Sequence, residues 1–69
     1  MDATYRALCD AADAAGLASL DAIRAYSDVI LAKPRRSAED RSVARAARDE
    51  AMARSETAYA ARDAYRRAR

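Results

Sequence analysis

A chain of 69 residues with a formal net charge of only +2 has room for one small domain, which we predict over residues 1–69. Its apolar content is mostly alanine, with 21 Ala against eight Leu, Ile or Val, four Tyr and two Met. One Gly and one Pro argue against β-rich and loop-rich folds, so the composition predicts an all-α protein. Because alanine favours helix but buries little area, we expect the folded unit to need a partner.

The composition also bears on which functions to expect. The chain has no His and a single cysteine, Cys9, and it lacks a Gly-rich phosphate loop, so we expect no enzyme activity, no metal and no cofactor. Cys9 is interpreted as a packed thiol. No apolar run approaches the roughly 18 residues of a membrane span, and no secretory-signal pattern is seen, so we expect a cytoplasmic protein without membrane contact.

The first predicted helix covers residues 3–32. Apolar or small residues recur there at steps of three and four, as a packed helix face requires, at Tyr5, Leu8, Ala12, Ala15, Ser19, Ile23, Tyr26 and Ile30. Two alternatives stay open. In the first alternative, Gly16 ends one helix and Ser19 caps another. In the second, residues 11–19 form the turn of a DNA-binding helix-turn-helix motif.

A turn is predicted over residues 33–37, because Pro34 disfavours helix at the preceding residue and Ser37 suits the N-cap of the next helix. The turn carries three basic side chains, Lys33, Arg35 and Arg36, which form a possible anion-binding site; otherwise they are simply solvated. Charge differs between the halves of the chain: residues 1–32 carry a net −3 and residues 33–69 a net +5. This asymmetry favours either an acidic helix folding on a basic one or a basic helix that meets an anion outside the chain.

The second predicted helix covers residues 38–68 and has its own line of residues at steps of three and four: Val43, Ala47, Ala51, Arg54, Ala58, Ala61, Tyr65 and Ala68. Two helices of equal length joined by a short turn predict an antiparallel two-helix hairpin, similar to a coiled coil, in which Tyr5 meets Tyr65. The large residues predicted for the core or a dimer contact are Tyr5, Leu8, Leu20, Ile23, Tyr26, Ile30, Val43 and Tyr65.

A second stripe follows the second helix, again at steps of three and four: Arg41, Arg45, Arg48, Met52, Ser55, Tyr59, Arg62, Arg66 and Arg69. We expect it to lie away from the first helix. Large apolar residues edged by arginines are typical of a protein interface, so Met52, Tyr59, Arg45, Arg48, Arg62 and Arg66 are predicted to bind a partner protein. The alternatives are a solvated face or nucleic-acid binding, which the neighbouring Asp49, Glu56 and Asp63 disfavour.

Three further leucines, Leu17, Leu20 and Leu31, lie beside the main line of the first helix, where one partner helix cannot cover them. We therefore predict a homodimer that forms a four-helix bundle. Glu50 and Arg54, four residues apart, either fix the register as a pair near the second line or extend to solvent.

The layout of two equal Ala- and Arg-rich helices around a Pro turn resembles small helical-hairpin dimers encoded by phages and plasmids, which bind host factors. Some of those proteins regulate RNA and others sequester host proteins. The resemblance implies a non-enzymatic, homodimeric protein-binding module that inhibits or regulates a partner such as a transcriptional regulator. The alternatives are a nucleic-acid-binding regulator that uses the basic turn and the arginine stripe, or a structural subunit of a larger assembly.

Overall fold

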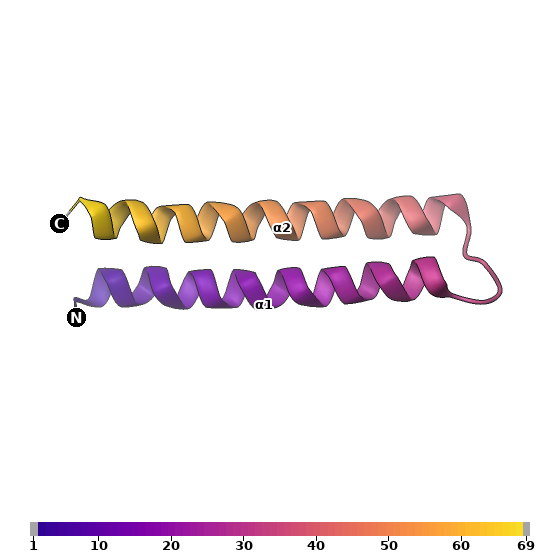
Figure 1. Cartoon of the computed structure of the whole chain (residues 1–69), viewed down its shortest axis with the longest axis horizontal. Helices are drawn as coiled ribbons and strands as arrows, with labels where there is room; N and C mark the ends of the chain where they lie inside the picture. The colour runs from indigo at the N-terminus through magenta and orange to yellow at the C-terminus, as the bar shows by residue number, and fades with distance from the viewer. Residues whose placement is uncertain (1, 69) are drawn as a thin grey trace.

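The computed structural model describes residues 2–68, which form two antiparallel helices joined by one turn (Figure 1). Helix α1 spans Ala3–Leu31 and helix α2 spans Ala38–Arg67. The hairpin is a rod of 52 × 14 × 12 Å, with both termini at one end and the turn at the other. The all-α hairpin predicted from the sequence is thus confirmed, and both helices end within one residue of the predicted bounds.

The helices begin where the sequence supplies capping side chains. Asp2 accepts a hydrogen bond from the backbone N–H of Tyr5 at 2.6 Å, and Ser37 accepts one from the N–H of Asp40 at 3.0 Å. Glu39 and Asp40 lie in the first turn of α2, and Arg66 and Arg67 lie in its last turn. The charges at both ends therefore interact favourably with the helix dipole. These local signals fix the boundaries of α2 before any packing is considered.

Helix α1 is continuous through Gly16, and its backbone there has no positive φ. The alternative of a break at Gly16 with a new cap at Ser19 is therefore wrong. The helix-turn-helix interpretation is wrong for the same reason, because residues 11–19 contain no turn. The Ser19 hydroxyl instead donates to the carbonyl oxygen of Gly16 at 2.8 Å, inside the helix.

The side of α1 that packs on α2 follows the predicted line in its first half only. Its buried or half-buried members at steps of three and four are Tyr5, Leu8, Ala12, Ala15, Ser19, Ala22, Tyr26 and Val29. Ala22 and Val29 thus occupy the positions predicted for Ile23 and Ile30. Those two isoleucines are exposed at the edge of the contact. In the half of α1 nearer the turn, the observed line is therefore shifted by one residue from the predicted line.

The packing line of α2 differs more from the prediction. Its half-buried members are Arg41, Ala44, Arg48, Ala51, Ser55, Ala58, Arg62 and Tyr65. Val43, predicted for the core, is 64% exposed, and Arg54 is exposed as well. The expectation that the arginine stripe lies away from α1 is wrong, because three of its arginines, Arg41, Arg48 and Arg62, lie on the packing line of α2. Hydropathy alone misplaced them, since an arginine can bury its aliphatic stem while its charged head stays in water.

Three tyrosines set the register of the hairpin. Tyr5 and Tyr65 stack at the terminal end, with ring centroids 6.2 Å apart, which confirms the predicted pairing. The hydroxyl of Tyr65 donates to the Oδ2 atom of Asp2 at 3.0 Å, so one carboxylate both caps α1 and holds the end of α2. Nearer the turn, the guanidinium of Arg48 lies 4.3 Å from the ring centroid of Tyr26.

The core of the hairpin is thin. Among the described residues only Ala12 is fully buried, and no large side chain is. Of the residues predicted for the core or dimer contact, Leu20, Ile23, Ile30 and Val43 are exposed in the hairpin, so their burial requires a second molecule. The packing between the helices consists mainly of alanines, tyrosine rings and arginine stems, with Leu8 and Val29 as its aliphatic members.

Candidate interaction surface

Most of the large exposed apolar side chains lie on one side of the hairpin, which we call the apolar face. It comprises Leu17, Leu20, Ile23, Ile30 and Leu31 of α1 with Met52 and Tyr59 of α2. Leu17 is 65% exposed and Leu31 is 75% exposed, whereas Met52 and Tyr59 are near 40%. Val43 is the one other large exposed apolar residue among those described, and it lies on the other side.

The contact between Gly16 of α1 and Tyr59 of α2 joins the apolar residues of the two helices into one surface. A Cβ atom added at Gly16 would lie 3.0 Å from Tyr59 Oη and 3.6 Å from its Cε2, so the ring rests directly on the glycine. Ile23 and Met52 follow seven residues from this contact toward the turn on their respective helices, and Ile30 follows Ile23 by another seven. A seven-residue step keeps a side chain on one side of a packed helix, so these residues extend one continuous surface.

Two shallow grooves shape this face. The central one, of about 590 Å³, is lined by Asp13, Gly16, Leu17, Ser19, Leu20, Ser55 and Tyr59. The second, of about 490 Å³, lies at the turn and is lined by Ile30, Leu31, Ala32, Lys33, Arg35, Arg41 and Arg45. The apolar face therefore changes along the rod, from leucines and a tyrosine at mid-length to isoleucine, leucine and basic side chains at the turn.

The arginines predicted to bind a partner divide into two groups. Arg48 and Arg62 each lie over a tyrosine ring, and each donates hydrogen bonds to the aspartate next in sequence. The bond to Asp63 raises the pKa of the Arg62 guanidinium. Because these two arginines are engaged inside the hairpin, their main contribution is to its packing.

Arg45 and Arg66 lie seven residues beyond Met52 and Tyr59, one at each end of that line. The hydroxyl group of the nearby Tyr26 side chain raises the pKa of the Arg45 guanidinium. Arg66 lies 3.9 Å from Asp63 and remains mostly exposed. The predicted apolar centre with arginines at its edges thus keeps Met52, Tyr59, Arg45 and Arg66 on one line, and the structure adds the leucines and isoleucines of α1 beside them.

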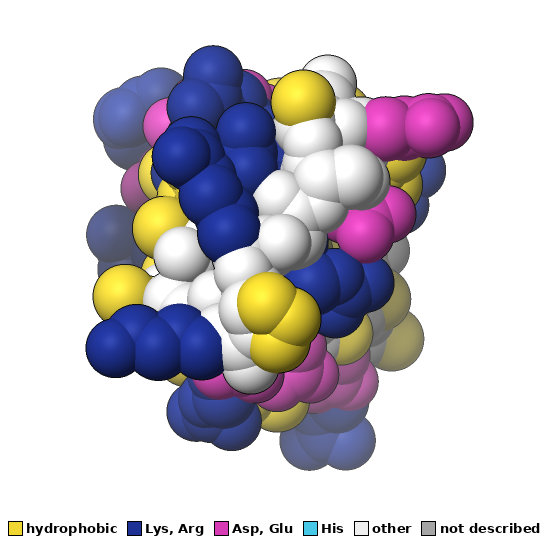
Figure 2. All heavy atoms as spheres, turned by 90° about the vertical axis from the view of Figure 1, so that its right-hand side faces the viewer, with side chains coloured by type: hydrophobic (Ala, Val, Ile, Leu, Met, Phe, Trp, Pro, Cys, Tyr) yellow, Lys and Arg dark blue, Asp and Glu magenta, His cyan; other side chains and the backbone are white. Residues whose placement is uncertain are grey.

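Basic side chains gather at the turn end of the rod. Figure 2 shows this end, where one group of Lys and Arg side chains clusters at the upper left, further basic side chains lie elsewhere, and acidic ones lie at the right and along the bottom. Lys33 and Arg35 line the groove at the turn, whereas Arg36 pairs with Asp40 at 3.1 Å. Of the three residues predicted for an anion site, two therefore share a groove, and the third is neutralised by a neighbour.

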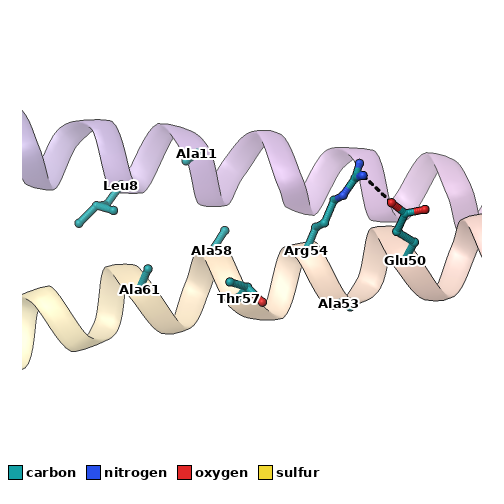
Figure 3. Close-up of a pocket in the computed structure, with 8 residues that line it drawn as sticks. All are labelled: Leu8, Ala11, Glu50, Ala53, Arg54, Thr57, Ala58 and Ala61. Atoms are coloured by element: carbon teal, nitrogen blue, oxygen red, sulfur yellow. Dashed lines mark hydrogen bonds and ion pairs between the residues drawn. The ribbon is translucent and has the colours of Figure 1, made fainter.

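The opposite side of the hairpin is lined mainly by alanine. Its groove, of about 430 Å³, is bounded by Leu8, Ala11, Glu50, Ala53, Arg54, Thr57, Ala58 and Ala61 (Figure 3). Glu50 and Arg54 form an ion pair at the end of this groove with 63% and 74% of their side chains exposed. The alternative in which this pair extends to solvent is therefore confirmed. Val43 shares this side, because it precedes Glu50 by seven residues.

Within residues 2–68, no three His, Cys, Asp or Glu side chains are grouped so that they would hold a metal ion. In that part of the chain neither helix contains a stretch long and apolar enough to cross a membrane. Cys9 is half-buried and is a free cysteine. Comparisons of the chain with protein-family models, with curated proteins and with solved structures give no match.

Sequence reasoning noted the surplus leucines of α1 and the Met52/Tyr59 pair of α2 as separate features. It missed that they form one surface. The only sequence signal for this union is Gly16, the single residue of α1 small enough to let a tyrosine ring lie against the backbone. The glycine alone does not show that the ring packed against it belongs to Tyr59, because that depends on the register of the two helices.

Proposed function

We propose that this chain is a non-enzymatic protein-binding module, a helical-hairpin homodimer that inhibits or regulates another protein, for example a transcriptional regulator. The observation that carries the proposal is the apolar face, which gathers seven of the eight large exposed apolar side chains on one side of a thin rod. Contiguous exposed apolar surface edged by charge is typical of protein-binding sites.

The size of the side chains supports the same conclusion. Full burial of a Leu, Ile or Met side chain contributes about 1.5–3 kcal/mol, and Tyr and Met are enriched at interface centres. With a core of one fully buried alanine, the hairpin gains little of this stabilisation by itself. A second molecule on the apolar face would therefore contribute to folding as well as to recognition.

The residues predicted for the dimer contact and those predicted for the partner lie on the same side. Leu20, Ile23 and Ile30 belong to the first set, and Met52 and Tyr59 to the second. One face cannot hold two occupants at once. We therefore propose that the partner protein replaces one copy of the homodimer and presents an apolar helical surface of its own.

The test compares two substitutions at residues of equal exposure. Leu17→Asp changes the apolar face and Val43→Asp the opposite side, at positions that are 65% and 64% exposed. In sedimentation velocity we expect wild type and Val43→Asp to be dimers and Leu17→Asp a monomer. A monomeric wild type, or equal behaviour of the two variants, would contradict the proposal.

The partner is sought by affinity capture from the native host with wild type, Val43→Asp and the double variant Met52→Asp/Tyr59→Asp. The proposal expects one protein to be retained by the first two and lost with the third. That protein, once purified, should form a complex with a single copy of the chain. If the double variant captures it as well as wild type does, the apolar face is not the binding site.

Nucleic-acid binding is the second candidate, and the groove at the turn is the observation that favours it. Lys33, Arg35, Arg41 and Arg45 line that groove without an acidic side chain among its lining residues. Affinity for DNA or RNA would then fall steeply as salt rises, and Lys33→Ala/Arg35→Ala would weaken it. Absence of binding in fluorescence anisotropy at low salt would remove this candidate.

A further inference from the structure

The surface area of the hairpin indicates how much of it a second molecule should cover. Its accessible area is 5176 Å², whereas a compact monomer of this mass exposes about 4,200 Å². The excess, about 1,000 Å², is comparable to the ~800 Å² that each partner buries in a standard protein interface. A second copy laid along the rod would remove an area of this size from water and give the pair a more compact shape.

The apolar side chains are distributed unevenly along the rod. They extend from Leu17 and Tyr59 at mid-length to Ile30 and Leu31 at the turn. The half of the same side nearer the termini holds none of them. It carries charged residues instead, namely Arg6, Asp10, Asp13 and Arg66, which are all exposed.

This uneven distribution selects among two-fold arrangements of two hairpins packed face to face. If the turns lay at opposite ends with full overlap, Ile30 and Leu31 would meet the charged terminal half of the other copy. Sliding the copies until their apolar halves met would leave both terminal halves uncovered. Only an axis parallel to the rod, with both turns at the same end, places the apolar half of each copy on that of the other while the two rods overlap along their full length.

The charges of the helices agree with this arrangement. An axis parallel to the rod places α1 of each copy against α2 of the other. Helix α1 carries four Asp and two Arg, whereas α2 carries seven Arg and six acidic residues, so helices of opposite net charge would meet. At the terminal half, Asp10 and Asp13 would approach the second copy's Arg66 and Arg67, which is favourable at an interface rim.

We propose that a second copy of this chain covers the apolar face, with the two-fold axis along the rod and both turns at the same end. The inference rests on the homodimer part of the proposed function and adds the arrangement of its subunits. The four helices then form a bundle in which every helix is antiparallel to its neighbours. The basic residues of the two turns, Lys33, Arg35 and Arg36 of each copy, gather at one end of this bundle.

The experiment measures distances between nitroxide labels in the dimer by double electron–electron resonance. Cys9→Ala removes the native thiol, and a single cysteine is then placed at the turn by Arg35→Cys or near the termini by Ala7→Cys. Both positions are exposed, which keeps the labels away from the packing between α1 and α2. Dilution with unlabelled protein must abolish the dipolar signal, which shows that it arises between copies.

With turns at the same end, both label pairs lie at equal heights on adjacent hairpins, so each separation should be about 30 Å or less. A turn-to-turn separation near the 52 Å length of the rod would overturn the arrangement in favour of opposite ends with full overlap. A short separation at the turn with a long one near the termini would overturn it in favour of a staggered pair.

Sedimentation of the same labelled proteins separates the two possible failures. A dimer with either of the contrary distance patterns refutes the arrangement and leaves the homodimer intact. A monomer at the concentrations of the distance measurement refutes the homodimer itself and, with it, the arrangement.

Discussion

Gly16 offers a sharp test of the contact on which the apolar face is built. Replacing a helical glycine with alanine stabilises a helix by about 1 kcal/mol, because the glycine loses more backbone entropy on folding. In this hairpin the new Cβ would lie 3.0 Å from Tyr59 Oη, which is too close for an unperturbed contact. The other ring atoms near it, Cε2 at 3.6 Å and Cζ at 3.8 Å, are at ordinary van der Waals distances.

The crowding is confined to one atom at the far end of a flexible side chain that is 36% exposed. Moving Oη by a few tenths of an ångström needs only a small rotation of Tyr59, at a cost below the 0.5–1.5 kcal/mol of a ~30° rotamer distortion. We therefore expect Gly16→Ala to stabilise the protein by a net of about 0.5 kcal/mol. In a Tyr59→Phe background, which lacks Oη, the same substitution should recover the full gain of about 1 kcal/mol.

The assay is urea unfolding of the four proteins of this cycle, followed by circular dichroism at 222 nm. All four are compared at one protein concentration, because self-association makes apparent stability depend on concentration. Equal effects of Gly16→Ala in the two backgrounds would show that Tyr59 does not rest on Gly16. A loss of more than 1 kcal/mol with wild-type Tyr59 would refute the argument that the ring yields easily.

Three further pairs of substitutions test the ends and the middle of the hairpin by the same unfolding assay. Asp2→Ala removes both the cap of α1 and the acceptor of the Tyr65 hydrogen bond, so it should lower the free energy of unfolding by about 1–3 kcal/mol. Tyr65→Phe removes the hydrogen bond between the helices alone and should lower it by about 0.5–1.5 kcal/mol. An equal loss in the two variants would mean that the cap contributes nothing. Ser37→Ala should cost about 1 kcal/mol through the lost cap of α2, against little change for the exposed mid-helix control Ser27→Ala. Arg48→Ala should cost about 1 kcal/mol, with partial recovery in Arg48→Lys, since stacking on a tyrosine ring needs both the stem and the charge; full stability of Arg48→Ala would show that this stacking contributes nothing.

The helices could be predicted from the sequence because their boundaries depend on local chemistry. Ser37 and Pro34 act within one turn of their own positions, and continuity of the apolar period across Gly16 favoured one long helix. The meeting of Tyr5 and Tyr65 followed from equal helix lengths alone. None of these inferences required knowledge of which side of α2 turns inward.

The packing side of α2 could not be predicted, because alanine and arginine lie on every side of that helix. An inward alanine and an outward alanine differ little in buried area, so hydropathy gives no clear phase. The side is selected by contacts that cross between the helices, since Arg48 must reach the ring of Tyr26 and Tyr65 must stack on Tyr5. That information is tertiary, and for this reason the apolar face emerged only when α1 and α2 were seen together.

The double role of Asp2 has a consequence for the order in which the hairpin opens. Its carboxylate joins the first turn of α1 to Tyr65, a residue 63 positions away, next to the stacking of Tyr5 on Tyr65. The turn, by contrast, joins residues close in sequence, and its loop closure is entropically cheap. Opening should therefore begin at the termini and advance toward the turn, and amide hydrogen exchange should slow in that direction along both helices.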